Sequence, residues 1–363
     1  MTVLAPYQNQ IMFGHHDVVQ RLKQSLDNNA LHHAIILAGA EGIGKETLCY
    51  QLMRYALSRP IKSEEDDGMF GGGLLGDEAP QRDDFIITEE HPVFRKVAAQ
   101  SHPHIFTIQP VFDEKKQRFK RDITLAALDG LAEFLRLKPS ENAPRFILIN
   151  PADGMNNNTQ NALLKMLEEP PENTFFFLLT TQMGRLLPTI RSRCLAVTME
   201  PVSFDDFNRA LIRLEPEISD YDSRALYGLS GGAIGQALQN HAIGALENYG
   251  NLCRAILAWH EDGDSAPAMK YADDISRDEV LSERMVDIIA ERLSTVLKQY
   301  VLVQESTAII PEEDRVLTVW RGLTQSQILE LYDYTRSQWA ACDAGYLDRK
   351  QVFLQIIKKL SAV

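Results

Sequence analysis

Residues 34–45 read AIILAGAEGIGK, a short apolar run followed by a glycine-rich turn and a lysine. The apolar run predicts a buried strand, and the residues after the lysine have the apolar spacing of a helix. Gly39, Gly44 and Lys45 therefore match G-x-x-x-x-G-K, the phosphate-binding P-loop, with Gly42 inside the turn. The backbone N–H groups of such a loop surround phosphate oxygens, and its lysine reaches the outer phosphates. A glycine-rich turn with an incidental lysine is the alternative.

The residues that hold Mg²⁺ in an active P-loop enzyme are replaced in this chain. The residue after the P-loop lysine is normally Ser or Thr, whose hydroxyl binds the metal, and here it is Glu46. At the end of a later predicted strand, Asn150 and Pro151 stand where such enzymes carry acidic residues. Asn adds no charge to a metal site, and a carboxylate at position 46 repels a polyanion. We therefore expect weak nucleotide binding at most, and no hydrolysis. An unorthodox Mg²⁺ site built from Glu46 and Asp153 is the alternative.

The pattern of apolar and polar residues divides the chain into three parts. The first two hundred residues alternate strand-like and helical stretches, which predicts a parallel sheet with helices on both faces. Residues 60–91 interrupt that alternation with an acidic run and a triple glycine, and we expect a flexible insertion there. We expect an α/β core at 1–200, a small helical bundle at 201–242 and an all-α domain at 243–363.

Composition limits the function classes. The chain has 363 residues, with 37 Lys and Arg against 50 Asp and Glu, so its net charge of −13 argues against a global electrostatic hold on nucleic acid. The exception is residues 115–121, a basic stretch that either touches DNA phosphates or forms a solvated turn. No apolar run is long enough to cross a bilayer, and no signal peptide is visible. The four cysteines form no C-x-x-C pair, so we expect a reducing cytoplasm and no zinc.

Two further segments carry a family resemblance. Residues 161–171 read NALLKMLEEPP, and residues 187–194 read LPTIRSRC, with Thr180 just before the second segment. They resemble the clamp-loader AAA+ subunits of replicative DNA polymerases, strongly over the first two hundred residues and in outline beyond. The resemblance implies an AAA+ P-loop core with a parallel sheet, a small helical lid and an all-α C-terminal collar. Thr180 corresponds to the family's sensor strand. Gln236 stands where active members carry a sensor-2 arginine.

The resemblance also implies a role. The S-R-C motif places Arg193, or the nearby Arg191, as an arginine finger acting in trans on a neighbouring ATPase subunit, an effect worth about 10³ to 10⁵ in rate. A surface arginine held in an ion pair is the alternative. The implied partners are the gamma and tau ATPase subunits, the delta subunit, the sliding clamp and primed DNA, all within the DNA polymerase III holoenzyme.

We accordingly expect a non-hydrolysing member of a pentameric ring, itself without ATPase activity. Two alternatives stay open. One is a nucleotide-binding regulatory subunit that holds ATP through Lys45 and the loop amides. The other is an active clamp-loader ATPase with the atypical Mg²⁺ site.

Overall fold

The computed structural model describes residues 5–59, 85–110, 112–113, 118–119, 123–137, 143–302 and 307–362. The chain divides into two compact units, Thr2–Phe207 and Asn208–Val363. Most of the expected insertion at 60–91, and most of the basic stretch at 115–121, lies outside the described residues.

The centre of the first unit is a five-stranded parallel sheet. Its strands are β1 (Ala34–Ala38), β2 (Ile105–Ile108), β5 (Arg145–Ile149), β6 (Thr174–Thr180) and β7 (Leu195–Thr198). They lie in the order β2-β5-β6-β1-β7, and every residue of β1 and β5 is buried, as two covered faces require. Ala38 pairs with Thr180, so the carboxyl ends of β1 and β6 meet at the edge where open α/β sheets bind ligands.

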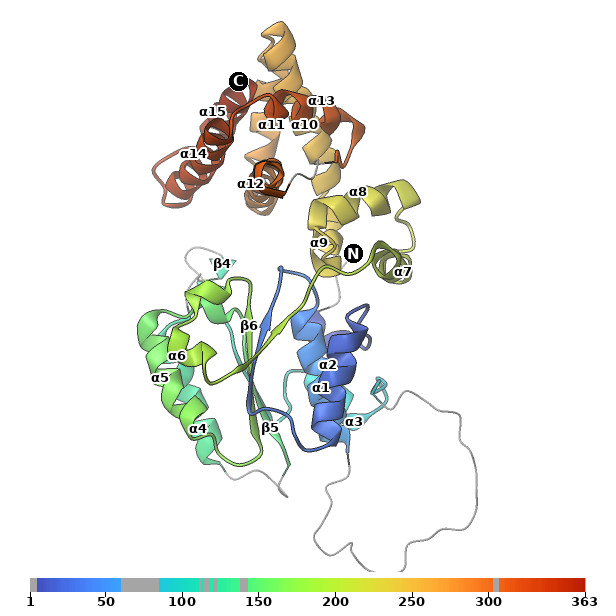
Figure 1. Cartoon of the computed structure of the whole chain (residues 1–363), viewed down its shortest axis with the longest axis vertical. Helices are drawn as coiled ribbons and strands as arrows, with labels where there is room; N and C mark the ends of the chain where they lie inside the picture. The colour runs from blue at the N-terminus through green and yellow to red at the C-terminus, as the bar shows by residue number, and fades with distance from the viewer. Residues whose placement is uncertain are drawn as a thin grey trace, which may run out of the picture. The chain divides into compact units, whose positions relative to one another are not determined.

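Helices cover both faces of this sheet (Figure 1). The helices on one face are α1 (His16–Asp27), α2 (Lys45–Ser58) and α3 (Pro92–Ala98), and those on the other are α4 (Asp129–Arg136), α5 (Asn157–Glu168) and α6 (Pro188–Arg191). Apolar side chains of Leu131 in α4 and Leu163 in α5 pack with Ile147 and Phe176 of the sheet. The predicted α/β core with its parallel sheet is confirmed.

Short elements complete the first unit. Single 3-10 turns lie at η1 (Pro6–Gln8), η2 (Leu125–Leu128), η4 (Ala152–Gly154) and η5 (Met183–Arg185). Strands β3 (Phe112–Asp113) and β4 (Arg118–Phe119) pair antiparallel. The segment 125–136 begins with a 3-10 turn and becomes α-helical only at Asp129.

The described residues of the second unit are helical and form no strand. Its helices are α7 (Phe204–Leu214, within which the division falls), α8 (Asp220–Ser230), α9 (Ile234–Ala242), α10 (Ala245–Asp262), α11 (Ala266–Ile275), α12 (Glu279–Leu302), α13 (Pro311–Arg321), α14 (Gln325–Asp343) and α15 (Arg349–Ser361). Leu252, Ile289, Trp320 and Phe353 belong to one shared apolar core. The expected all-α C-terminal part is present, and the separation of a lid at 201–242 from a collar at 243–363 stays a prediction.

Side-chain caps define where several of these helices begin. The Ser219 hydroxyl accepts the backbone N–H of Asp222 at the start of α8, and the Asp348 carboxylate accepts that of Gln351 at the start of α15. At α8's other end, Gly231 adopts a left-handed φ of 58°, a conformation that glycine tolerates better than other residues.

Candidate functional site

The candidate site is the glycine-rich loop between β1 and α2. Gly42 and Gly44 have φ of 71° and 106°, values that side chains with a Cβ rarely adopt. A Cβ on Gly44 would also lie 2.6 Å from Cε of Met12, so space as well as conformation requires glycine there. His15 supports the loop from outside, because its Nε2 lies 3.1 Å from the carbonyl oxygen of Ile43 and donates to it. Gly39 joins the loop to the sheet through a bond from its N–H to the carbonyl of Thr180.

Lys45 is turned back onto the loop that it follows. Its side chain is buried, and Nζ donates to the carbonyl oxygens of Gly39 at 2.8 Å and Ala40 at 2.7 Å. Burial lowers the pKa of Lys45, and nearby acidic groups, Glu41 first among them, offset part of that effect. The ammonium group is thus held by the carbonyls of the loop, and a nucleotide would have to compete with them.

Glu46 and Asn150, at the two positions where the P-loop pattern predicts metal ligands, form a pair. The Nδ2 of Asn150, at the end of β5, donates to Oε2 of Glu46 at the start of α2 over 2.8 Å. Burial raises the pKa of Glu46, while the hydrogen bond from Asn150 and the charge of Lys45 lower it. Each side chain therefore satisfies the other without a metal ion.

Asp153 is held elsewhere in the site. Its carboxylate is buried and accepts two bonds from Thr181, from the backbone N–H at 3.3 Å and from the hydroxyl at 3.0 Å. The neighbouring Thr180 is fully buried, and its hydroxyl accepts the N–H of Gln182 at 3.0 Å. Asp153 thus joins the end of β6 to the turn after β5, and it hydrogen-bonds to Thr181 and not to Glu46.

Arg193 lies just beyond α6, in the same unit. Its guanidinium pairs with Oε1 of Glu168, at the end of α5, over 2.6 Å and donates to the carbonyl of Thr189 over 2.9 Å. The two charged side chains remain 35% and 47% exposed, so the pair is a surface contact. Arg193 is therefore held in a defined place and stays accessible to a partner.

The remaining residues of the predicted site are distributed differently. Gln236 belongs to α9 in the second unit, where its amide donates to Oδ1 of Asn240 at 3.3 Å. Cys49 is buried at the start of α2, and burial raises the pKa of Cys194 to about 12, so neither thiol has the lowered pKa of a nucleophile.

The described residues, with the gaps given above, contain neither a candidate metal cluster nor a candidate membrane span. Within those ranges no group of three or more His, Cys, Asp or Glu side chains is placed to hold a metal ion. His102 and His104 lie edge to face, and burial lowers the pKa of His102 to about 4. None of the helices in the described ranges combines the length and the apolar character that a membrane span needs.

Sequence reasoning gave no role to Glu168 or to the contact between Asp153 and Thr181. Both contacts join elements far apart in the chain, so no local pattern marks them. The one available signal for Glu168 is its place in the segment 161–171, in which an acidic pair ends a predicted helix.

Several known proteins similar to this chain are subunits of DNA polymerase III. A family model described as DNA polymerase III, delta subunit, matches residues 14–203. The chain is 29% identical to the DNA polymerase III subunit delta' of Pseudomonas aeruginosa over 65% of its length, and 27% identical to that of Escherichia coli over 68%. These alignments cover 64% and 65% of the two relatives, less than two thirds of each.

Other similar proteins are gamma subunits or proteins related to them. The DNA polymerase III subunit gamma of Buchnera aphidicola is 26% identical over 68% of this chain and 61% of its own. Among solved structures, a gamma subunit-related protein of Thermotoga maritima aligns over 94% of this chain and 99% of its own, with 15% identity and a TM-score of 0.45. The family model spans more than half of the chain, and with the delta' relatives it shows that the chain belongs to the DNA polymerase III delta family, in its delta-prime clamp-loader branch.

Proposed function

We propose that this chain is a non-hydrolysing subunit of a clamp loader, which supports the loading of a sliding clamp on primed DNA. The observation that carries the proposal is the bond between Asn150 and Glu46, because it fills the position of two Mg²⁺ ligands with a self-satisfied pair. Lys45 supports it, since the loop carbonyls already engage the ammonium group. A P-loop in this state offers neither two free metal ligands nor a free lysine to stabilise charge on a γ-phosphate.

The same proposal gives Arg193 a role in trans. In a ring of P-loop subunits each nucleotide lies at an interface, so a subunit without catalysis of its own can complete the site of its neighbour. A guanidinium suits that role because it is always charged and offers a planar fork of donors. The partial exposure of Arg193, and its fixed place against Glu168, fit a group presented at a surface.

The proposed role also specifies the partner subunits of the chain and its cellular compartment. We propose a pentameric ring with gamma and tau ATPase subunits and a delta subunit, acting on clamp and primed DNA in the cytoplasm. The support is the family and its gamma relatives. The ring order is left to experiment.

The test is ATP turnover by the reconstituted loader on clamp and primed DNA, with wild type compared with Arg193→Ala. Arg191→Ala is measured beside it, because Arg191 is the alternative finger two residues away. We expect the isolated chain to show no ATP turnover. We expect Arg193→Ala to lose about 10³-fold or more in the rate of the one neighbouring site while the complex still assembles. Equal rates in the Arg193→Ala and wild-type complexes would refute the finger and leave a scaffold.

A nucleotide-binding regulatory subunit is the second candidate, favoured by the intact glycine conformations of the loop. It predicts saturable ATP binding by the isolated chain that Lys45→Ala abolishes, without turnover. Turnover by the isolated chain itself would instead support an active ATPase with Glu46 and Asp153 around Mg²⁺.

A further inference from the structure

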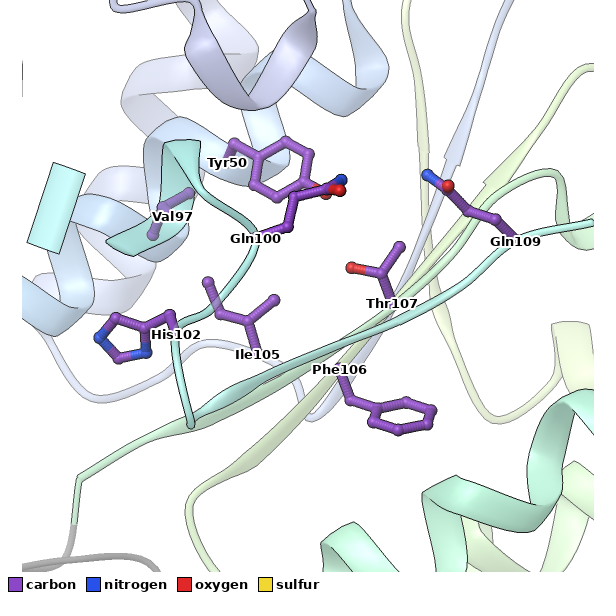
Figure 2. A pocket seen from close by; sticks show the side chains of 8 residues that line it. All are labelled: Tyr50, Val97, Gln100, His102, Ile105, Phe106, Thr107 and Gln109. Carbon is purple, nitrogen blue, oxygen red and sulfur yellow. The ribbon is translucent and has the colours of Figure 1, made fainter. Parts of the chain in front are cut away.

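A second cavity lies in the first unit, between α2, the segment after α3 and the sheet-edge strand β2 (Figure 2). Its volume is about 350 Å³, at the small end of the range for ligand pockets. Tyr50 of α2 lines it, while the P-loop lysine stands at the first residue of that helix. Nucleotide phosphates at the loop would therefore not occupy this space.

The Tyr50 hydroxyl is the observation that marks the cavity as a site. The side chain is 98% buried, since only 2% of it is exposed, and its oxygen makes no hydrogen bond of full geometry, although the Thr107 and Gln100 side chains lie close enough to lower its pKa in part. A buried hydroxyl without a partner is costly, so native proteins rarely leave one unused. Figure 2 shows this hydroxyl directed into the same space as the ends of Gln100, Thr107 and Gln109.

The polar groups around the cavity are neutral. Two carboxamides (Gln100 and Gln109) and two hydroxyls (Tyr50 and Thr107) each offer both a donor and an acceptor. The Nδ1 of His102 accepts the backbone N–H of His104, so its Nε2 carries the proton. Burial lowers the pKa of His102 to about 4, which leaves the ring uncharged at neutral pH.

The apolar part of the lining suits a flat ring. Val97 and Ile105 contribute hydrocarbon surface beside the polar groups, while the Phe106 ring turns to the other face of the sheet and packs against Phe134. Ile105, Thr107 and Gln109 follow each other at a period of two along and just beyond β2, which turns them to one face of the sheet. The cavity thus combines hydrocarbon walls with convergent hydrogen-bonding groups, and it has no cation for a phosphate or carboxylate.

We propose that this cavity binds a small, uncharged, planar heterocycle that carries a hydrogen-bond donor beside an acceptor, the chemical class of a free nucleobase. A glutamine carboxamide makes two parallel bonds with such an edge, as glutamine does with adenine. The Tyr50 and Thr107 hydroxyls then bind the remaining polar atoms of the ring. This inference is independent of the proposed clamp-loader role and of the P-loop.

The test uses the full chain with cytosine and adenine as probes, and adenosine monophosphate as the charged comparison. Binding is followed by ligand-observed NMR and by calorimetry. We expect saturable binding of at least one free base, weaker binding of the monophosphate, and about five- to tenfold weaker base binding by Tyr50→Phe, which removes one hydroxyl. Tyr346→Phe is the matched control, because that tyrosine is 82% exposed in the other unit.

A second variant distinguishes a loss of binding from a loss of folding. Thr107→Val removes the other hydroxyl with little change of shape, and thermal melting checks that each variant folds. The proposal is overturned if neither base binds wild type up to about 5 mM, a concentration that corresponds to negligible affinity. It is also overturned if Tyr50→Phe and Thr107→Val, both folded, bind like wild type. Loss of binding in Lys45→Ala but not in Tyr50→Phe would place the base at the P-loop and equally overturn it.

Discussion

The buried charge network of the second unit offers a sharp stability prediction. Glu313, fully buried in α13, accepts bonds from Arg292 Nε at 2.5 Å, from the Tyr249 hydroxyl at 2.8 Å and from the Ile309 N–H at 2.6 Å. Arg292 is itself buried and also donates a hydrogen bond to the carbonyl of Thr307. The carboxylate therefore neutralises a buried cation and satisfies two more donors. Glu313→Ala removes all of this at once.

The expected cost follows from that geometry. Removing one partner of a buried ion pair costs about 3 to 5 kcal/mol, because the other charge stays buried without compensation. The free energy of unfolding of a domain is about 5 to 15 kcal/mol, so this loss is a large fraction of it. With a urea m-value of about 2 kcal/mol/M, a loss of about 4 kcal/mol moves the midpoint down by about 2 M.

The assay follows tryptophan fluorescence during urea unfolding. All three tryptophans of the chain, at 259, 320 and 339, lie in the second unit, so their signal reports the unit that contains the network. The control is Glu312→Ala, the same substitution one residue earlier. Glu312 pairs with Arg254 at the surface, with side chains 35% and 53% exposed, and such pairs contribute less than about 1 kcal/mol.

The comparison of Glu313→Ala with Glu312→Ala tests this prediction. If Glu313→Ala and Glu312→Ala lower the free energy of unfolding equally, within about 0.5 kcal/mol, the network contributes no more than a surface pair and the reasoning is wrong. A folded Glu313→Gln variant refines the result, since it keeps one acceptor oxygen, removes the charge and replaces the other acceptor with an amide donor. It should fall between wild type and Glu313→Ala.

Two further predictions concern the first unit. Burial lowers the pKa of His102 from 6.5 to about 4, so the unfolded chain binds more protons than the folded one between those values. The free energy of unfolding should therefore be level above pH 6.5 and fall as the pH drops toward 4. Melting followed by circular dichroism should show a smaller fall for a folded His102→Gln variant, and parallel profiles would contradict the assignment. At the loop, Glu46→Thr combined with Asn150→Asp restores a hydroxyl and a carboxylate for Mg²⁺, so MgATP affinity, measured by calorimetry, should rise about tenfold or more. No gain over wild type would show that Lys45 and the loop, not the metal ligands, limit binding.

The parts of the fold that were predictable are those encoded locally. The run at 34–38 is apolar throughout and short, so it identified a buried strand. The start of α4 was less accessible, because the 3-10 turn at Leu125–Leu128 and the α-helix after it share one apolar spacing. Strand β7, with three of its four residues exposed, carries too weak an apolar signal to stand out.

The residues of the candidate site were predictable from the sequence, but the contacts between their side chains were not. The motif places Lys45 at the loop, yet nothing in G-x-x-x-x-G-K says that the ammonium turns back onto Gly39 and Ala40. The pairing of Arg193 with Glu168 and the buried hydroxyl of Tyr50 both depend on how separate elements pack. Sequence spacing does not carry that information.

The replacements at positions 46 and 150 are coupled by the contact between their side chains. From sequence, Glu46 and Asn150 read as two separate losses in a metal site. Their side chains lie within one hydrogen bond, and an aspartate at 150 would put a second carboxylate against the partly buried Glu46, where like charges repel. An amide at 150 is therefore what a glutamate at 46 requires, and the two replacements are one coupled change. Gln236, in the other unit and bonded to Asn240, is the separate observation that points the same way.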